Sequence, residues 1–360
     1  MRLKIFLLTV LIDCTGLFGC SDSGSNNGSG TDADTDSDSD SYSDTDTDTG
    51  FDSDKYPNGF KVIGYLPTWG TFDSNLTAAD FTKLTHINIA FGNPDSDGNL
   101  EENLSSDQIA ALVAKASEHN VKVSISLGGA IAPSYEDLLN DDSRANFVAQ
   151  LVSYVEKHNL DGIDIDLEGN NIPTNYEEFV TDLAKELKPE KLLTAALGKW
   201  YSNQITDAAL EQFDWINLMS YDVTGSWEPE TAGQHSPYSK AEGDLSHFIM
   251  RDVPSTQLVV GVPFYGYDFQ YDTPNLMYVS YSKIVNGHSG AENSDQVDEI
   301  YYNGIDTMVK KVQLAKDSET GGIMIWEITQ DVDSNDDRSL LKAIYAEALS
   351  SASAGVTFDS

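Results

Sequence analysis

The residues best suited to chemistry are four carboxylates in one short segment, which reads DGIDIDLE over residues 161–168. Polar and apolar residues alternate here, and side chains alternate between the two faces of a β-strand. Asp164, Asp166 and Glu168 therefore share one face. Carboxylates packed this closely do not all ionise, so at least one should have a raised pKa. A carboxylic acid that stays protonated near neutral pH can act as a general acid on a leaving oxygen.

The same alternation also describes an ordinary amphipathic strand with its acidic face in water, which is common in antiparallel sheets. Aspartate is depleted from strands, however, and side chains two residues apart on one face are separated by only about 7 Å. Three carboxylates on an inward face repel one another and destabilise the fold, so their presence there calls for a functional reason. We therefore favour the catalytic interpretation.

Beyond Lys55, short apolar segments alternate with longer amphipathic ones. Buried strands are predicted at residues 62–66, 84–91, 121–127, 162–168, 192–197, 215–221, 258–264 and 322–326. Apolar residues three and four apart predict helices at residues 107–119, 143–158, 176–187, 304–316 and 338–349. Eight such strand-helix units predict a parallel α/β sheet closed into a (β/α)8 TIM barrel.

The competing fold is a doubly wound open sheet, which usually carries a Gly-x-Gly-x-x-Gly turn after its first strand. The sequence there is GYLPTWG at residues 64–70, without that turn. We therefore expect the barrel, whose active site forms at the C-terminal ends of the strands. Glu168 stands at such an end.

The segment DGIDIDLE resembles the DxxDxDxE signature of family 18 glycoside hydrolases, the chitinases and their relatives. Three more strand ends resemble elements of that family in the same order: SLGG at 126–129, MSYD at 219–222, and GGIMIW at 321–326 with Asp331 after it. The resemblance runs from Val62 to Leu349. It implies one catalytic domain, over residues 56–360, that hydrolyses β-1,4-linked N-acetylglucosamine polymers such as chitin.

The resemblance also implies a role for each matching residue. Glu168 should protonate the glycosidic oxygen and later activate water, while the substrate's own 2-acetamido group attacks the anomeric carbon. Asp166 should orient that group, Asp164 should exchange a proton with Asp166, and Tyr221 should donate to the acetamido oxygen. Further substrate contacts are expected from Trp326 under the reacting sugar and from Tyr65, Ser126, Met219 and Asp222. Of these, Tyr65 and Ser126 match positions that hydrogen-bond the inner aspartate.

Other aromatic residues stand near predicted strand ends, namely Trp69, Trp200, Trp227 and Tyr265. Each could stack on a sugar face or belong to the core, and the sequence leaves both roles open. Tyr267 is a departure, because many chitinases carry an arginine there. The chain between Tyr267 and Gly321 is short, so we expect no large insertion domain between the seventh and eighth strands and a shallow, open groove.

The first 20 residues have the layout of an export signal, with Arg2 and Lys4 before an apolar run at 5–12 that is too short to span a bilayer. The ending LFGC resembles the bacterial lipobox, in which the cysteine is acylated after cleavage. Cys14 and Cys20 are the only cysteines, so a chain starting at Cys20 has no disulfide partner. We predict a lipoprotein signal peptide over 1–20, with an ordinary cleaved signal peptide as the alternative.

Residues 21–55 are rich in Ser, Thr and Asp and almost devoid of apolar residues, which predicts a disordered linker. The chain carries a formal net charge of −38; residues 1–20 contribute +1 and the eleven aspartates of residues 21–54 contribute −11, which leaves −28 for the remainder. Such acidity argues against nucleic acid as a partner and fits a neutral glycan, although adaptation to salt would produce it equally. We expect a monomer without metal or cofactor.

Two other functions share these motifs. One is an endo-β-N-acetylglucosaminidase acting on glycoprotein N-glycans, and the other is a non-catalytic glycan-binding protein. Non-catalytic members of the family typically lose the terminal glutamate or its neighbours. Every acidic position of the signature is present here, which disfavours the second alternative.

The lipobox predicts an exported bacterial lipoprotein, held at the outer membrane or cell surface by an acyl chain on Cys20. Replacing Cys20 with serine should move the protein from the membrane fraction to the soluble fraction of fractionated cells, because the acylated thiol is lost. Unchanged membrane partition of Cys20→Ser would contradict the lipidation.

Overall fold

The computed structural model describes residues 55–100, 103–169, 172–271 and 273–350. The predicted signal peptide and residues 21–54 of the predicted linker lie outside these ranges, so both stay predictions. Among the described residues, no helix is both long enough and apolar enough to cross a membrane.

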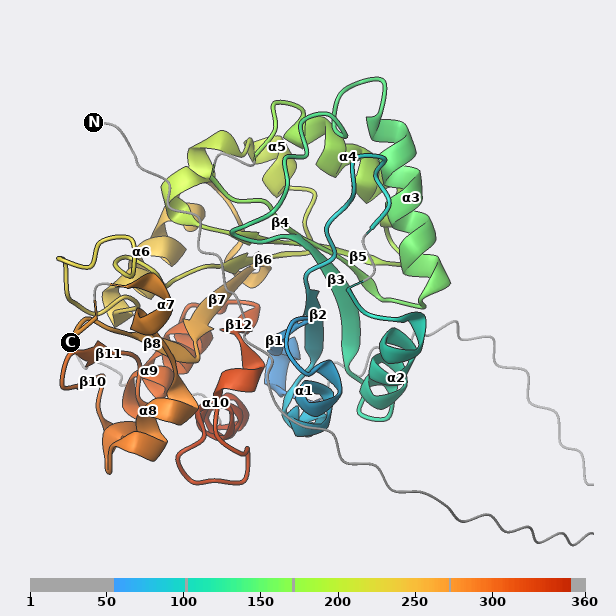
Figure 1. The fold of residues 1–360 in the computed structure, drawn as a ribbon. Coiled ribbons are helices and arrows are strands. Elements are labelled where there is room, and N and C mark those ends of the chain that lie inside the picture. The colour runs from blue at the N-terminus through green and yellow to red at the C-terminus, as the bar shows by residue number, and fades with distance from the viewer. Residues whose placement is uncertain (1–54, 101–102, 170–171, 272, 351–360) are drawn as a thin grey trace, which may run out of the picture.

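Eight parallel strands close into a barrel in the order β1-β12-β7-β6-β5-β4-β3-β2, which confirms the predicted fold (Figure 1). Their bounds are β1 Lys61–Pro67, β2 His86–Ala90, β3 Lys122–Gly128, β4 Gly162–Asp166, β5 Leu192–Leu197, β6 Trp215–Leu218, β7 Leu258–Pro263 and β12 Gly322–Trp326. The strands β4 and β6 end earlier than predicted. As a result Glu168 and Tyr221 lie just past the C-terminal strand ends, where the backbone is no longer bound to the neighbouring strands.

Helices cover the outside of the barrel. The main ones are α1 Phe72–Ala78, α2 Ser106–Ser117, α3 Arg144–Lys157, α4 Tyr176–Leu187, α5 Asp207–Leu210, α6 Tyr238–Ile249, α9 Ile305–Asp317 and α10 Leu340–Leu349. The helix α6 was not among those predicted, because Gly243 lowers its helix propensity and Asp244 is buried at a core-facing position.

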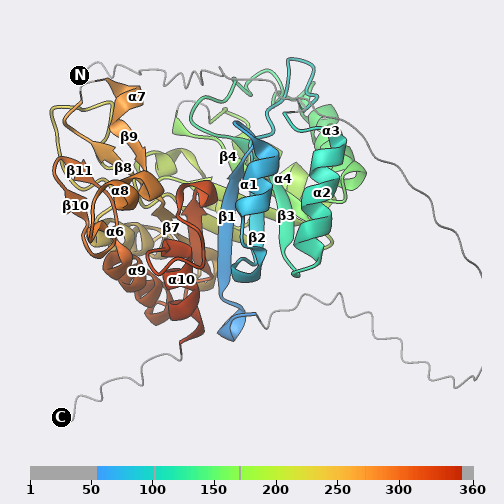
Figure 2. The same ribbon diagram turned by 60° about the horizontal axis from the view of Figure 1, so that its bottom comes forward.

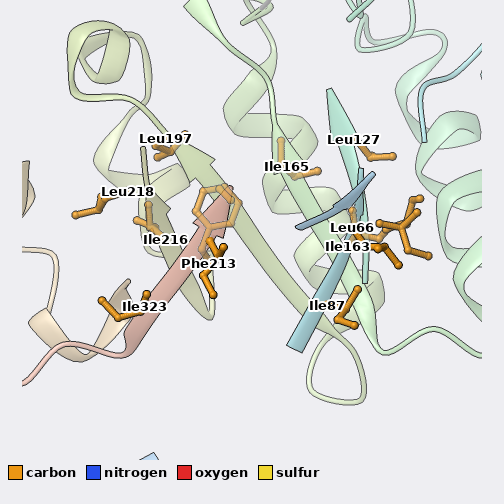
Figure 3. Packing of buried hydrophobic residues seen from close by; sticks show 14 of the residues in the cluster. Leu66, Ile87, Leu127, Ile163, Ile165, Leu197, Phe213, Ile216, Leu218 and Ile323 are labelled. Atoms are coloured by element: carbon orange, nitrogen blue, oxygen red, sulfur yellow. The ribbon is translucent and has the colours of Figure 1, made fainter. Parts of the chain in front are cut away.

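The core lies mainly between the strands and these helices. Ile163, Ile165 and Leu167 of the carboxylate segment are fully buried in it. Figure 3 labels the first two among their apolar neighbours. A smaller apolar cluster that includes Ile63, Val259 and Met324 is separate from this shell. The alternation predicted for the carboxylate segment is therefore observed: its apolar side chains join the shell and its acidic ones do not.

A small insertion separates β7 from β12. It holds an antiparallel sheet in the order β10-β11-β8-β9, together with α7 Pro274–Met277 and α8 Tyr281–Gly287. The strands β8 Tyr265–Asp268, β9 Tyr278–Ser280, β10 Gln296–Val297 and β11 Ile300–Tyr301 are two to four residues long, too short for the sequence pattern to reveal. The insertion lies beside α6 and α9 (Figures 1 and 2), and its first strand supplies Tyr265 and Tyr267 to the site.

Candidate active site

The carboxylate of Asp164 lies at the centre of the site and is 0% exposed. Side chains of four other strands donate to it, at 2.6 Å from Tyr65 Oη, 2.8 Å from Ser126 Oγ, 2.6 Å from Thr194 Oγ1 and 3.2 Å from Asn217 Nδ2. Tyr65 lies on β1 and Asn217 on β6, and neither strand is next to β4 in the barrel. Their contacts with Asp164 therefore pass through the barrel interior. Burial raises the pKa of Asp164, and the four hydrogen bonds oppose that rise.

Thr194 and Asn217 bind the central carboxylate of the site, and neither was predicted as a site residue from the sequence. Each is the one polar residue among apolar ones in its strand, LLTAAL for β5 and WINL for β6. The register pairs Asp164 with Ser126 on one side and with Thr194 on the other. A lone polar residue at an inward position of a buried strand is the signal that would have found both.

Asp166 is 4% exposed, and its Oδ1 is buried without a hydrogen-bond partner among the described residues. Burial, and then the charges of Glu168 and Asp164, raise the pKa of Asp166 well above its usual range. Leaving a buried oxygen unpaired is costly. The Oδ1 atom is therefore suited to accept a hydrogen bond from a bound ligand.

Two glycines at the end of β3 allow the chain to pass close to Asp166. A Cβ atom on Gly128, whose φ is +117°, would lie 2.0 Å from the carbonyl oxygen of Asp166, and the Gly129 N–H donates to that same oxygen at 2.8 Å. A Cβ atom on Gly129 would lie 2.5 Å from the ring of Phe91. The SLGG element therefore permits close packing beside the carboxylate strand.

Glu168 follows β4 by two residues and is partly buried. Burial, and after it the charge of Asp222, raise the pKa of the Glu168 carboxyl to about 7. A large fraction of this side chain is then protonated at neutral pH. It can donate a proton to a leaving group and, once ionised, accept one from water.

Asp222, whose negative charge acts on Glu168, is held by three side chains. Its Oδ1 contacts Tyr265 Oη at 2.7 Å, Tyr267 Oη at 3.2 Å and His235 Nδ1 at 3.2 Å. The other ring nitrogen of His235 is 3.2 Å from the carbonyl oxygen of Tyr265.

Aromatic rings surround the carboxylates. Trp326 packs edge-on against Tyr65 with ring centroids 5.5 Å apart, stacks on Phe91 at 5.6 Å and approaches Trp69 at 6.2 Å. Tyr221 is 8% exposed and makes an edge contact with Tyr265 at 6.2 Å. Phe91, which belongs to this wall, carried no sequence signal of its own.

Three other aromatic residues present large exposed surfaces. Trp69 is 42% exposed, Trp227 is 46% exposed and Trp200 is 70% exposed. The indole of Trp200 lies over Gly169, the residue after Glu168, where a Cβ atom would approach it to 2.5 Å. These rings are open to solvent, which favours binding over core roles for them.

Four of the predicted substrate contacts are buried or partly buried in the structure. Tyr65 and Ser126 are buried and donate to Asp164, which confirms their predicted hydrogen bonds to the inner aspartate and shows that they support the carboxylates. Tyr265 is 2% exposed because its ring stacks on Tyr278, and its hydroxyl donates to Asp222. Met219 is partly buried and packs against both apolar clusters. Within the described ranges, no group of three or more His, Cys, Asp or Glu side chains could hold a metal ion.

Comparison with known proteins places these features in a family context. The family model of Glycosyl hydrolases family 18 matches residues 61–331. The chain is 39% identical to the GH18 chitinase ChiB from the chitin utilization locus of Flavobacterium johnsoniae, with a TM-score of 0.74 over 80% of this chain and 94% of that one.

Two curated relatives are more distant. Probable chitinase 10 of Drosophila melanogaster is 25% identical over 354 residues, which cover 76% of this chain and 15% of that protein. A chitinase-like effector of Moniliophthora perniciosa is 29% identical over 247 residues, 58% of this chain and 56% of that protein. The chain thus spans only part of the length of both.

The raised pKa of Glu168 can be measured without a substrate. We expect its side-chain carboxyl, observed by 13C NMR, to titrate with a midpoint of about 7. Replacing Asp222 with asparagine should lower that midpoint, because the nearby negative charge disfavours ionisation of Glu168. The matched control is Asp337→Asn, which removes the same charge from a side chain that is 99% exposed. Equal midpoints in Asp222→Asn and wild type would contradict this electrostatic coupling.

Proposed function

The chain belongs to glycosyl hydrolase family 18, and from that premise we propose that it hydrolyses β-1,4-linked N-acetylglucosamine polymers or oligomers, with chitin as the substrate class. One observation carries the proposal: Glu168, with its pKa near 7, stands two residues after Asp166, whose buried Oδ1 has no partner among the described residues. The first group can transfer a proton, and the second can receive the N–H of an acetamido group.

The first chemical step uses Glu168 as the acid. Its proton passes to the glycosidic oxygen as the bond to the anomeric carbon breaks, and the acetamido oxygen of the same sugar forms the new bond to that carbon. An oxazolinium ion and a free sugar hydroxyl result. Asp166 accepts the acetamido N–H and stabilises the positive charge that develops on the ring.

The second step uses Glu168 as the base. Its carboxylate takes a proton from water, whose oxygen attacks the anomeric carbon and opens the oxazolinium ion. The anomeric configuration is retained because two displacements have occurred. A pKa near 7 suits both steps, since neither protonation state is far from the ambient pH.

The inner aspartate and the aromatic rings complete this scheme. Asp164 lies in the same buried site as Asp166, and its charge raises the pKa of Asp166. The two carboxyl groups can therefore exchange a proton during the reaction. Trp326 is partly exposed and provides a floor for the reacting sugar, while exposed Trp69, Trp200 and Trp227 provide faces on which further sugars stack. Export and lipid anchoring through Cys20 would place this activity outside the cell, where polymeric glycans occur.

Two other outcomes are tested by the same assays. An endo-β-N-acetylglucosaminidase would release a high-mannose glycan from a glycopeptide and leave chitin oligomers intact. A non-catalytic glycan-binding protein would bind oligomers and cut neither substrate, an outcome that the chitinase-like effector among the relatives makes relevant. Product analysis by mass spectrometry on both substrates separates the three functions.

Glu168→Gln should reduce hydrolysis of chitin oligomers by about a hundredfold or more, because the side chain keeps its shape and loses its transferable proton. Binding of the same oligomers, measured by calorimetry, should be largely preserved. Glu178→Gln on the exposed face of α4 is the matched control and should behave as wild type. Retention of more than about a tenth of the wild-type rate by Glu168→Gln would exclude Glu168 as the acid.

Participation of the acetamido group predicts that the β-anomer is formed first, as observed by 1H NMR in the first minutes of hydrolysis. A thiazoline analogue should inhibit competitively, and oligomers without the acetyl group on the reacting sugar should stay intact. Asp166→Asn and Tyr221→Phe should lower kcat more than they change binding, because both groups act on the acetamido group as it becomes charged. Inversion of configuration would rule this mechanism out.

A further inference from the structure

A two-residue segment, His235 and Ser236, braces the turn that carries Tyr221 and Asp222. The Ser236 Oγ donates to the carbonyl oxygen of Ser220 at 2.7 Å, and the carbonyl oxygen of His235 accepts from the N–H of Val223 at 3.0 Å. These two bonds hold the backbone on both sides of the turn. The ring of His235 also contacts Asp222 itself, at 3.2 Å. The position of this segment therefore determines where the turn lies.

Lys311 of α9 holds Ser236 from behind. Its side chain is 0% exposed, and its ammonium donates to the Ser236 carbonyl oxygen at 2.8 Å, to Ser236 Oγ at 2.7 Å and to Asn303 Oδ1 at 2.8 Å. All three ammonium protons are thus used on neutral acceptors. The Nδ2 atom of Asn303 donates to the same Ser236 carbonyl oxygen at 3.0 Å.

A buried ammonium without a carboxylate in contact is unfavourable. None of the ion pairs within the described ranges includes Lys311. Burial lowers its pKa to about 7, opposed by the charges of Asp295 and Asp244 and assisted by that of Lys240. An apolar residue at position 311 would avoid burying a charge, but it could not form the hydrogen bonds to Ser236.

The helix α6 supports the same turn independently. Asp244 accepts from Ser220 Oγ at 3.0 Å and from Lys240 Nζ at 2.5 Å. Ser220 is therefore held through its side chain by α6 and through its carbonyl oxygen by Ser236. Both attachments lie one residue before Tyr221.

We propose that Lys311 is a positioning residue for the active site: by binding Ser236 it fixes the turn that sets Tyr221 and Asp222 against the carboxylates of β4. The inference rests on the proposed function, in which Tyr221 contacts the acetamido group. The inference also connects α9, on the outside of the barrel, to Glu168, since the charge of Asp222 contributes to the raised pKa of that residue.

The test replaces Lys311 with methionine, which has a similar length and no donor. We expect kcat on chitin oligomers to fall about tenfold or more with a smaller change in KM, because small displacements of catalytic groups can cost about a hundredfold. The alkaline limb of the kcat profile should move to lower pH, since Asp222 is no longer held near Glu168. A residue that acts only on the amount of folded protein would not move this limb.

Lys316→Met is the matched control on the same helix, because Lys316 pairs with Glu347 at 3.0 Å and has no bond to Ser236. It should keep the wild-type kcat and pH profile. Ser236→Ala retains the ammonium but removes the bond to Ser220, so it should change the pH profile in the same direction as Lys311→Met. If Lys311→Met does not fold, as judged by near-UV circular dichroism, Ser236→Ala carries the test.

The 13C NMR titration of Glu168 separates this inference from the proposed function, because it needs no substrate. A lowered midpoint in the folded variant supports the positioning role even if wild-type protein cuts no chitin oligomer. A folded variant with the wild-type midpoint and the wild-type kcat profile would overturn the inference.

Discussion

The hydrogen bonding of Asp164 is the constraint on which the rest of the structure depends. A carboxylate that is 0% exposed is tolerated only when its oxygens are satisfied, and here the donors come from four different strands. Any error in strand register would remove one of them and leave a charge unpaired in the interior. The hydrogen bonds that offset the cost of burying the Asp164 carboxylate therefore also specify how the barrel closes.

The strand β4 serves two environments at once. Its isoleucines face the helix shell in Figure 3, and its aspartates face the interior. A slip of one residue would exchange the two sets, placing carboxylates against α-helices and apolar groups in the site. Core packing on one face thus stabilises the position of the proposed catalytic groups on the other, which explains why one short segment carries both sets of side chains.

The barrel fold and the acidic face of the site could be predicted from the sequence, because the signals for both are local. The period of two along residues 162–168 identified the acidic face, and the eight apolar strands identified the barrel. The contacts of Asp164 with Thr194 and Asn217 required the register between strands, which no local pattern contains. The sequence left open whether Tyr265 stacks on a sugar or belongs to the core, because the small sheet that buries it has strands of two to four residues, too short to predict.

The two sides of the site are supported in physically different ways. Asp164 and Asp166 lie on a barrel strand that is hydrogen-bonded on both edges, so their positions are tied to the whole sheet. Tyr221 and Asp222 lie beyond the end of β6, on a turn held by Ser236, His235 and the insertion. The barrel strand fixes the buried positions of Asp164 and Asp166. The second side adds the charge of Asp222, which after burial contributes to the raised pKa of Glu168, and it is built from loops and helices that can change without disturbing the barrel.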